Sequence, residues 1–328
     1  MIAWGRIGVP AALMVLFAVP LIVIIKSRTI REEPMVLLIL NMTAVLVSFN
    51  ALFFVISIVD AVTANSMPHL LCSFLLSTGL AVFGGFKLST LLLAAEQYVA
   101  VVFSLQHFTI MSRWVNKMIA FTWLFIVGFS AIILLCFFLG LETIAEFDLR
   151  VFGIDHHINT CGWQKVANMG MFAFQIVFFL FTILTCGLLT YTAVQGLKHE
   201  KRIAGDNTSR QTENFVLRFK SFRRIVKLLL IFLIIDIIGT VIHIISRWFP
   251  VPTLFTYASH FVRTSSLVVE YWAYGISNAI IPKAIKKFFG FRRNHREPQG
   301  RPADSVPPRQ PPAAGPIAMI EVEANGTS

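Results

Sequence analysis

Charged side chains inside long apolar runs are the residues of this sequence with the most evident chemistry. They are Lys87, Glu96, Asp236 and Glu270. A charged group at the centre of a membrane helix costs roughly 2.5–3.5 kcal/mol on insertion scales, so such groups usually face the interior of a helix bundle and pair with one another. The chemistry that they offer is an internal ion pair. The alternative for Lys87 is contact with backbone carbonyls or water alone.

The four cysteines do not form a pattern typical of a metal or redox-active site. Cys136 and Cys186 lie within apolar runs, where a cysteine is usually a packing residue, and Cys72 and Cys161 lie at helix ends or in loops. The sequence has no Cys-x-x-Cys pair and no cysteine–histidine cluster, which are the usual signs of metal binding. Because no catalytic constellation is present either, we expect neither enzymatic activity nor a cofactor.

The composition limits the class of protein. Of the 328 residues, 56% are hydrophobic and only 14% are charged, whereas soluble domains carry about 25% charged residues. So little polar surface cannot cover a soluble globule, and part of the surface must face lipid. The net charge of +11 is concentrated between apolar runs and in the tail. This placement is typical of a membrane protein and argues against nucleic-acid binding.

The elements that must position these residues are long apolar helices. Seven stretches reach the roughly 20 residues that a helix needs to cross a bilayer. In chain order they are 7–25, 35–59, 70–103, 118–141, 166–197, 228–246 and 264–281. The runs are continuous rather than alternating, which excludes β-barrel strands. The sequence therefore predicts an all-α membrane protein, a seven-transmembrane helix bundle.

The distribution of basic residues predicts the orientation of this bundle. If the N-terminus is outside, the segments facing the cytoplasm hold 22 of the 28 Lys and Arg residues, and the outer segments hold five. Positive charge is retained on the cytoplasmic side of membrane proteins. We therefore expect a multi-pass membrane protein with an extracellular N-terminus and a cytoplasmic C-terminus.

Two further features follow the seventh run. Residues 283–296 combine basic side chains with apolar ones at helical spacing, which is typical of a short amphipathic helix on the inner membrane surface. From residue 297 the chain is rich in Pro, Ala and Gly, a composition that predicts disorder. The expected organisation is a membrane domain at 1–292, which includes this eighth helix, and a disordered cytoplasmic tail at 293–328.

Several residues stand in a characteristic order along these predicted helices. Cys72 opens the third helix, and 25 residues after it comes Gln97 in the triplet Glu96-Gln97-Tyr98. The others are Trp123, Cys161, Tyr191, Asn278 and the pair Phe288-Phe289. With seven helices and a basic amphipathic helix, this set resembles the rhodopsin-like (class A) G-protein-coupled receptors. The segment Arg-Glu-Glu-Pro at 31–34 is similar to that of divergent fish odorant-receptor-like and orphan receptors.

The resemblance implies a function. Such a receptor resides in the plasma membrane, binds a small, odorant-like molecule inside the bundle and passes a conformational change to a heterotrimeric G protein. The predicted extracellular segment before the first helix is only about six residues long, too short to capture a large peptide. The partners that we expect are therefore a small-molecule ligand, a heterotrimeric G protein and membrane lipid.

The resemblance also implies roles for individual residues. Cys72 and Cys161 are expected to form a disulfide on the oxidising side. The cavity for the ligand would be lined by Phe83, Gly239, His243, Val268 and Trp272. The face toward the G protein would include Glu96, Gln97, Tyr98 and Tyr191.

The sequence departs from the family at most of its switch positions. Gln97 replaces the Arg of the triplet, Leu46 replaces a sodium-binding Asp, and Gly79 replaces the Asp of the amine receptors. A glutamine carries no charge, so it cannot form the family's ionic lock. These departures leave a main alternative, a seven-helix scaffold that does not activate G proteins and acts as a partner or trafficking subunit. A transporter is a second alternative, but the sequence shows no repeated halves.

The same resemblance implies a specific partner for the intramembrane lysine. Asp236 stands where the family has a Trp in helix six, at a depth similar to that of Lys87 in helix three. We expect these two side chains to form an interhelical ion pair that replaces the missing switch. Glu270 is the competing partner, and in the family's geometry we expect it to turn away.

Overall fold

The computed structural model describes residues 2–27, 33–62, 69–103, 106–138, 169–205, 226–242, 265–275, 281–282 and 284–285. All regular secondary structure within these ranges is helical, and none of it is strand. The expectation of an all-α protein is confirmed at this level. The chain divides into two units, Met1–Gly290 and Phe291–Ser328. The second unit, with the predicted tail, lies outside the described residues.

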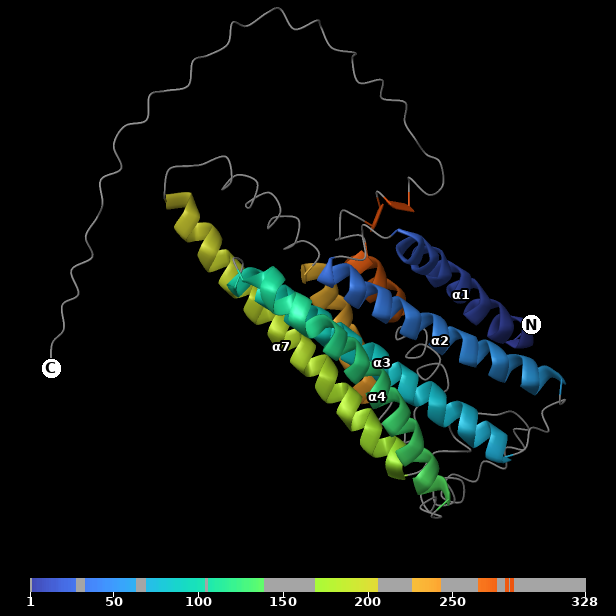
Figure 1. The fold of residues 1–328 in the computed structure, drawn as a ribbon. Coiled ribbons are helices and arrows are strands. Elements are labelled where there is room, and N and C mark those ends of the chain that lie inside the picture. Colours follow the sequence, from blue (N-terminus) through green and yellow to red (C-terminus); the bar gives the residue numbers. More distant parts are fainter. Residues whose placement is uncertain are drawn as a thin grey trace, which may run out of the picture. The chain divides into compact units, whose positions relative to one another are not determined.

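Five long helices make up most of the described first unit (Figure 1). They are α1 (Ile2–Lys26), α2 (Pro34–Val62), α3 (His69–Val102), α4 (His107–Phe138) and α7 (Met169–Gly205). Each is long and apolar enough to cross a membrane. Two shorter helical segments are also described: 226–242 overlaps the sixth predicted run, and 265–275 lies within the seventh. The structure thus has the helical character of a membrane protein.

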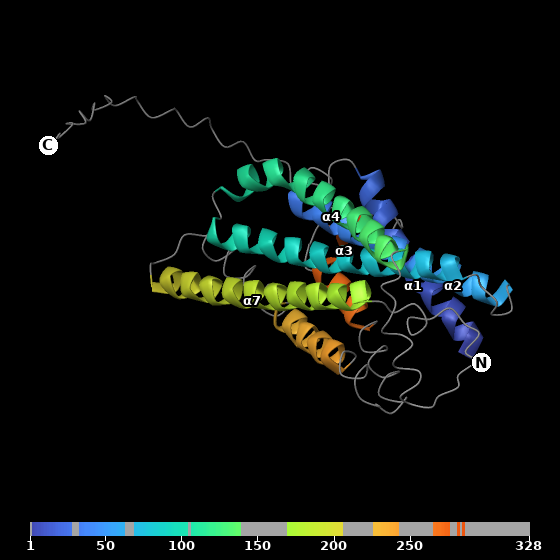
Figure 2. The ribbon, with the colours of Figure 1, turned by 90° about the horizontal axis from the view of Figure 1, so that it is seen from below.

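Helix α3 lies at the centre of the packing. It packs against α2, α4 and α7, and Figure 2 shows it between α4 and α7. In the most apolar window of α3, 78% of the residues are buried, whereas the corresponding share is 17–33% in the other four helices. A helix that is apolar on all sides must be buried in protein or face lipid. The side chains of α3 therefore form the interior of the bundle.

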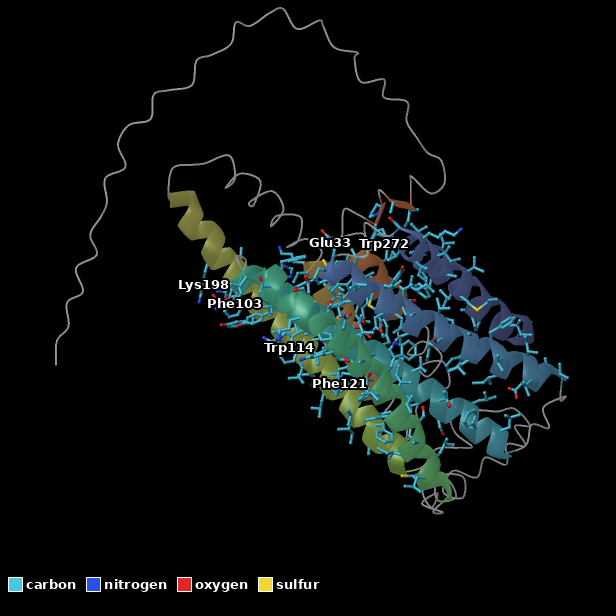
Figure 3. The ribbon with its side chains drawn as sticks, in the orientation of Figure 1. Glu33, Phe103, Trp114, Phe121, Lys198 and Trp272 are labelled. Carbon is cyan, nitrogen blue, oxygen red and sulfur yellow. The ribbon has the colours of Figure 1, made fainter. Side chains whose placement is uncertain are left out.

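The outer helices expose large apolar side chains instead. On α4, Trp114 and Phe121 are 49% and 54% exposed (Figure 3), and Leu124 is 71% exposed. Such side chains would be unfavourable in water over so wide a surface, but hydrocarbon solvates them. Lys117 lies 4.7 Å from the centre of the Trp114 ring, a cation–π contact. This pair marks the end of α4 that carries its charges.

Two adjacent glycines let the neighbouring helices approach α3 closely. A Cβ atom on Gly84 would overlap the ring of Phe178 on α7, and one on Gly85 would overlap the side chain of Ile126 on α4. Small residues at helix interfaces allow close backbone approach in membrane proteins. The glycines therefore set the spacing of three helices near the middle of the bundle, one turn from Lys87.

A hydrogen-bonded bridge joins α2, α3 and α4. The Asn41 side-chain amide donates to Oγ of Ser89 at 3.2 Å, and Nε1 of Trp123 donates to Oδ1 of Asn41 at 3.0 Å. Asn41 is 4% exposed, so its amide needs these partners. Trp123, at a position where the sequence resembles the receptor family, thus has a structural role.

Replacing Asn41 with Leu is expected to lower the free energy of unfolding by about 1–2 kcal/mol, because two neutral hydrogen bonds at about 0.5–1.5 kcal/mol net are lost. The melting temperature of the purified chain measures the effect. Trp123→Phe should lose part of the same contribution, and the double variant should be less destabilised than the sum. Trp114→Phe is the matched control, because Trp114 is exposed. Additive effects of Asn41→Leu and Trp123→Phe would contradict the bridge.

Candidate functional site

The charged residues singled out from the sequence meet in the middle of the bundle. Nζ of Lys87 lies 2.9 Å from Oδ2 of Asp236 and 3.1 Å from Oε1 of Glu270. The three side chains are 2%, 3% and 0% exposed. The structure therefore brings Lys87 and Asp236 together, and it ties α3 to both shorter segments, 226–242 and 265–275. We call these three residues the charge cluster.

The expectation that Glu270 turns away from Lys87 was wrong. In the segment 265–275, Leu267, Glu270, Tyr271 and Tyr274 are buried, and their spacing of three and four residues places them on one face of a helix. This face is directed inward, and it carries the Glu270 carboxylate to Lys87. The sequence did not reveal it, because the opposite face is apolar as well and the segment has no polar side to mark the outside.

Lys87 is also surrounded by aromatic rings. Its Nζ lies 5.7 Å from the centre of the Phe83 ring and 5.5 Å from that of Phe86. Both distances are within the range of cation–π attraction, which strengthens when the cation is removed from water. One ammonium is thus held by two carboxylates and two rings, an arrangement that fixes the middle of α3.

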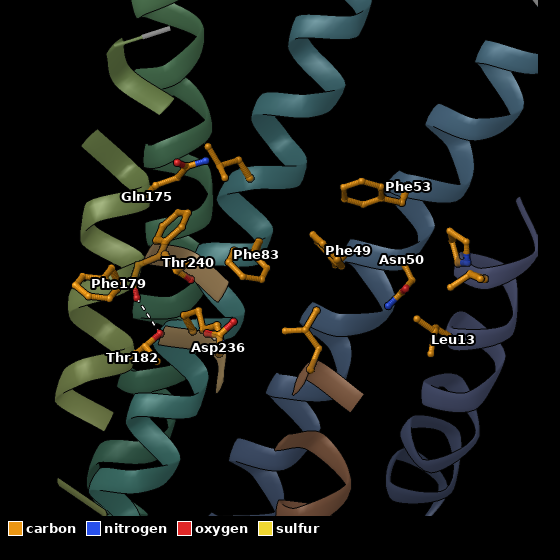
Figure 4. Close-up of a pocket in the computed structure, with 16 residues that line it drawn as sticks. Leu13, Phe49, Asn50, Phe53, Phe83, Gln175, Phe179, Thr182, Asp236 and Thr240 are labelled. Carbon is orange, nitrogen blue, oxygen red and sulfur yellow. Dashed lines mark hydrogen bonds and ion pairs between the residues drawn. The ribbon is translucent and has the colours of Figure 1, made fainter. Parts of the chain in front are cut away.

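A cavity of about 230 Å³ opens beside the cluster. Lys87 and Asp236 line it, together with residues from α1, α2, α7 and the segment 265–275 (Figure 4). Its aromatic lining residues are Phe49, Phe53, Phe83, Phe178 and Phe179. Its uncharged polar lining residues are Asn50, Gln175, Thr182 and Thr240. Apolar walls with a few convergent polar groups are typical of small-molecule sites.

No known protein-family model and no curated protein matches this chain. The interpretation of the cavity therefore rests on its own residues.

The predicted ligand residues lie at different places around this cavity. Phe83 lines the cavity. Gly239 is buried but does not line it, and the lining residues from its helix are Asp236 and Thr240 instead. Val268 is half-buried, and Trp272 is 57% exposed (Figure 3). Neither belongs to the lining, which takes Leu267 from this segment. His243 lies outside the described residues.

The rotation of the helices explains this shift. Successive residues in an α-helix differ by about 100°, so an error of one residue in the assumed register moves a side chain to another face. The buried polar residues Asn50 and Gln175 were missed by the sequence analysis, although both interrupt apolar runs. A buried amide needs hydrogen-bond partners, just as an intramembrane charge needs a partner. The two amide residues within apolar runs were therefore a signal that the sequence contained.

The triplet Glu96-Gln97-Tyr98 lies near the C-terminal end of α3, beyond the charge cluster. Oε1 of Glu96 forms a 2.8 Å hydrogen bond with Nε2 of His107, at the start of α4. The Tyr98 and Tyr191 rings lie 5.8 Å apart, which joins α3 to α7. Gln97 is 5% exposed, and its Oε1 has no hydrogen-bond partner within the part of the chain that the structure describes. The structure thus brings these four predicted residues to one end of the helices, although Gln97 is buried.

The cysteines behave in two ways. Cys72 is disulfide-bonded, whereas Cys136 and Cys186 are free thiols and half-buried. Cys161, the expected partner of Cys72, lies outside the described residues, so this pairing stays a prediction. In the described ranges no group of three or more His, Cys, Asp or Glu residues is arranged to hold a metal ion.

Proposed function

We propose that this chain is a divergent rhodopsin-like G-protein-coupled receptor with seven membrane spans. Its N-terminus is extracellular, it resides in the plasma membrane, and it binds a small, odorant-like molecule in the cavity beside the charge cluster. Ligand binding shifts the population toward a conformation in which the cytoplasmic face accepts a heterotrimeric G protein.

The observation that carries this proposal is that Lys87 and Asp236 belong both to the cavity wall and to the charge cluster. A molecule in the cavity touches the ion pair that holds the segment 226–242 against α3. A ligand shifts a conformational equilibrium only if it interacts differently with the two states. A contact that connects two helices directly at the cavity wall provides that difference, because moving one helix changes both the pair and the cavity.

The arrangement at the other end of α3 supports the same proposal. Glu96, Tyr98 and Tyr191 join α3 to α4 and α7 there, at the end that the basic residues predict to be cytoplasmic. Any movement of α3 relative to its neighbours alters these contacts. In our proposal, this end is the face that meets the G protein.

The proposal is tested by measuring G-protein activation in transfected cells, with and without a panel of odorants and metabolites. Gln97→Arg is expected to change basal signalling, because it restores the cation with which the family locks its inactive state and then meets the G protein. Surface expression, measured in parallel, controls for loss of folding. Gln106→Arg is a matched control, since it adds the same charge to an exposed site.

The alternative is a seven-helix scaffold without G-protein activation. The burial of an uncharged Gln97 favours it, because a neutral, buried side chain is unable to supply the exposed cation of the triplet. If neither the native chain nor Gln97→Arg activates any G protein at normal surface expression, this alternative is correct. Recovery of another receptor as a co-purifying partner would then identify the role.

A further inference from the structure

The ammonium of Lys87 has one more hydrogen-bond donor than the described residues engage. A lysine ammonium has three N–H donors. Two of them face carboxylate oxygens, Oδ2 of Asp236 at 2.9 Å and Oε1 of Glu270 at 3.1 Å. In the described part of the chain, no third oxygen accepts from Nζ. The rings of Phe83 and Phe86 lie 5.7 and 5.5 Å from Nζ, but a ring face is a weaker acceptor than an oxygen.

The cavity gives a ligand access to this ammonium. Lys87 lines the cavity, whereas Glu270 does not, so a molecule in the cavity meets Nζ on a side that Glu270 leaves open. Lys87 is 2% exposed, and a buried donor without an acceptor is unfavourable. Thr182, another lining residue, donates its hydroxyl hydrogen to the Phe178 carbonyl at 3.1 Å. The donor that remains for a ligand oxygen is therefore the third N–H of Lys87.

This part of the wall suits an uncharged ligand. Lys87 and Asp236 both line the cavity, and their charged atoms lie 2.9 Å apart. A cation that approached Asp236 would also come close to the Lys87 ammonium. An anion that approached Lys87 would become the third negative group around it, after Asp236 and Glu270. Because attraction and repulsion then act over similar distances, they largely cancel, and a neutral group with a strong dipole fits the ion pair better.

The other walls of the cavity suit an aromatic ring. Phe83 and Phe178 pack edge to face, with ring centres 5.9 Å apart, and both rings line the cavity. Aromatic rings prefer such offset and edge-to-face contacts with one another. A cavity of about 150 Å³ in another protein holds benzene, so about 230 Å³ accommodates one ring with a short substituent.

We propose that this cavity binds a small, uncharged aromatic carbonyl compound, such as an aryl ketone. Its carbonyl oxygen accepts the third N–H of Lys87, and its ring lies among the phenylalanines. This inference rests on the proposed function and deepens it by naming the ligand class.

The first test compares ligands of one shape on the purified full-length chain in lipid nanodiscs without G protein. The probes are acetophenone and isopropenylbenzene, in which a CH₂ group replaces the carbonyl oxygen. Phenylethylamine and phenylacetate are the charged probes. Binding is measured from the rise in melting temperature with ligand concentration. Acetophenone should bind, and neither charged probe should bind as tightly. An amine or a carboxylate that binds more tightly than the ketone would overturn the proposal.

A triple variant identifies Lys87 as the donor. Lys87→Met with Asp236→Leu and Glu270→Gln removes the ammonium and leaves no member of the charge cluster as an uncompensated buried ion. The affinity of acetophenone relative to isopropenylbenzene should fall tenfold or more in this variant. Lys117→Met, which removes an exposed lysine on α4, is the matched control and should keep the native ratio. An unchanged ratio in the folded triple variant would refute the role of Lys87.

Infrared spectroscopy provides a test that needs no change to the charge cluster. A hydrogen bond to a carbonyl oxygen lowers its stretching frequency, so bound ¹³C-labelled acetophenone should show a band below that of the ketone dissolved in the lipid. Thr240→Met fills the cavity and should remove this band. Thr190→Met, at an exposed site on α7, is the matched control and should keep it. Absence of the band in the native chain, or its persistence in folded Thr240→Met, would contradict the proposal.

The outcomes separate this inference from the proposed function. Ketone binding with the lowered carbonyl frequency, but without any G-protein activation, would support the ligand class and contradict the receptor. Odorant-driven signalling without ketone binding would support the receptor and contradict the ligand class.

Discussion

Lys87→Met is expected to destabilise the chain more than any other single substitution in the charge cluster. Removing one partner of a buried ion pair costs about 3–5 kcal/mol, because the other charge remains buried and uncompensated. Here the loss of one ammonium leaves two carboxylates, those of Asp236 and Glu270, in contact with the same emptied site. Surface expression should fall sharply, and the melting temperature of any purified chain should fall with it.

The three-residue geometry predicts an asymmetry that a simple pair would not show. Asp236→Leu should be milder than Lys87→Met, since Lys87 keeps Glu270 at 3.1 Å. The double variant Lys87→Met with Asp236→Leu should recover little, because the Glu270 carboxylate is still buried without a cation. Adding Glu270→Gln should restore stability substantially.

Lys117→Met is the matched control for the loss of a lysine. Lys117 is exposed on α4, and exposed charges contribute little to stability, so this variant should express normally. Full recovery in the double variant, without any change at Glu270, would show that Glu270 is not a partner and that the cluster is a simple pair.

Gly84→Ala is expected to lower the free energy of unfolding by about 2–3 kcal/mol, in the upper part of the range for overpacked cores. The added methyl group would overlap the Phe178 ring on α7, and this ring is buried and packs against the rings of Phe83 and Phe129. The sign of this change in the free energy of unfolding is informative, because replacing Gly with Ala within a helix otherwise stabilises the helix by about 1 kcal/mol. The melting temperature measures the net effect of the overlap with Phe178 and of the higher helix propensity of Ala.

Two further variants identify the cause. Gly187→Ala, on α7, adds the same methyl group where nothing lies within 4 Å, so it should be neutral or stabilising. Phe178→Leu should rescue part of the loss caused by Gly84→Ala, because a smaller side chain leaves room for the methyl group. If Gly84→Ala and Gly187→Ala behave alike, the close approach of α3 and α7 does not depend on Gly84.

The sequence by itself determined the class of the protein. Low charge and long continuous apolar runs leave few alternatives to membrane helices, because unsatisfied backbone groups are too costly in lipid. Lys87, Asp236 and Glu270 could also be identified from the sequence, because an intramembrane charge stands out against any apolar background. The resemblance to the receptor family pointed to Glu96 and Tyr98 at one end of the third helix.

Only the tertiary structure decided how these helices face one another. The helices are apolar both toward protein and toward lipid, so the sequence contains no amphipathic pattern from which rotation is read. The orientation of each helix about its own axis places Glu270 next to Lys87 and directs Trp272 outward. It also places Asn50 and Gln175 at the cavity. Close packing at Gly84 and Gly85 depends on the side chains that lie opposite them, Phe178 and Ile126. Such a contact is a property of two helices together, so the sequence of one helix alone does not contain it.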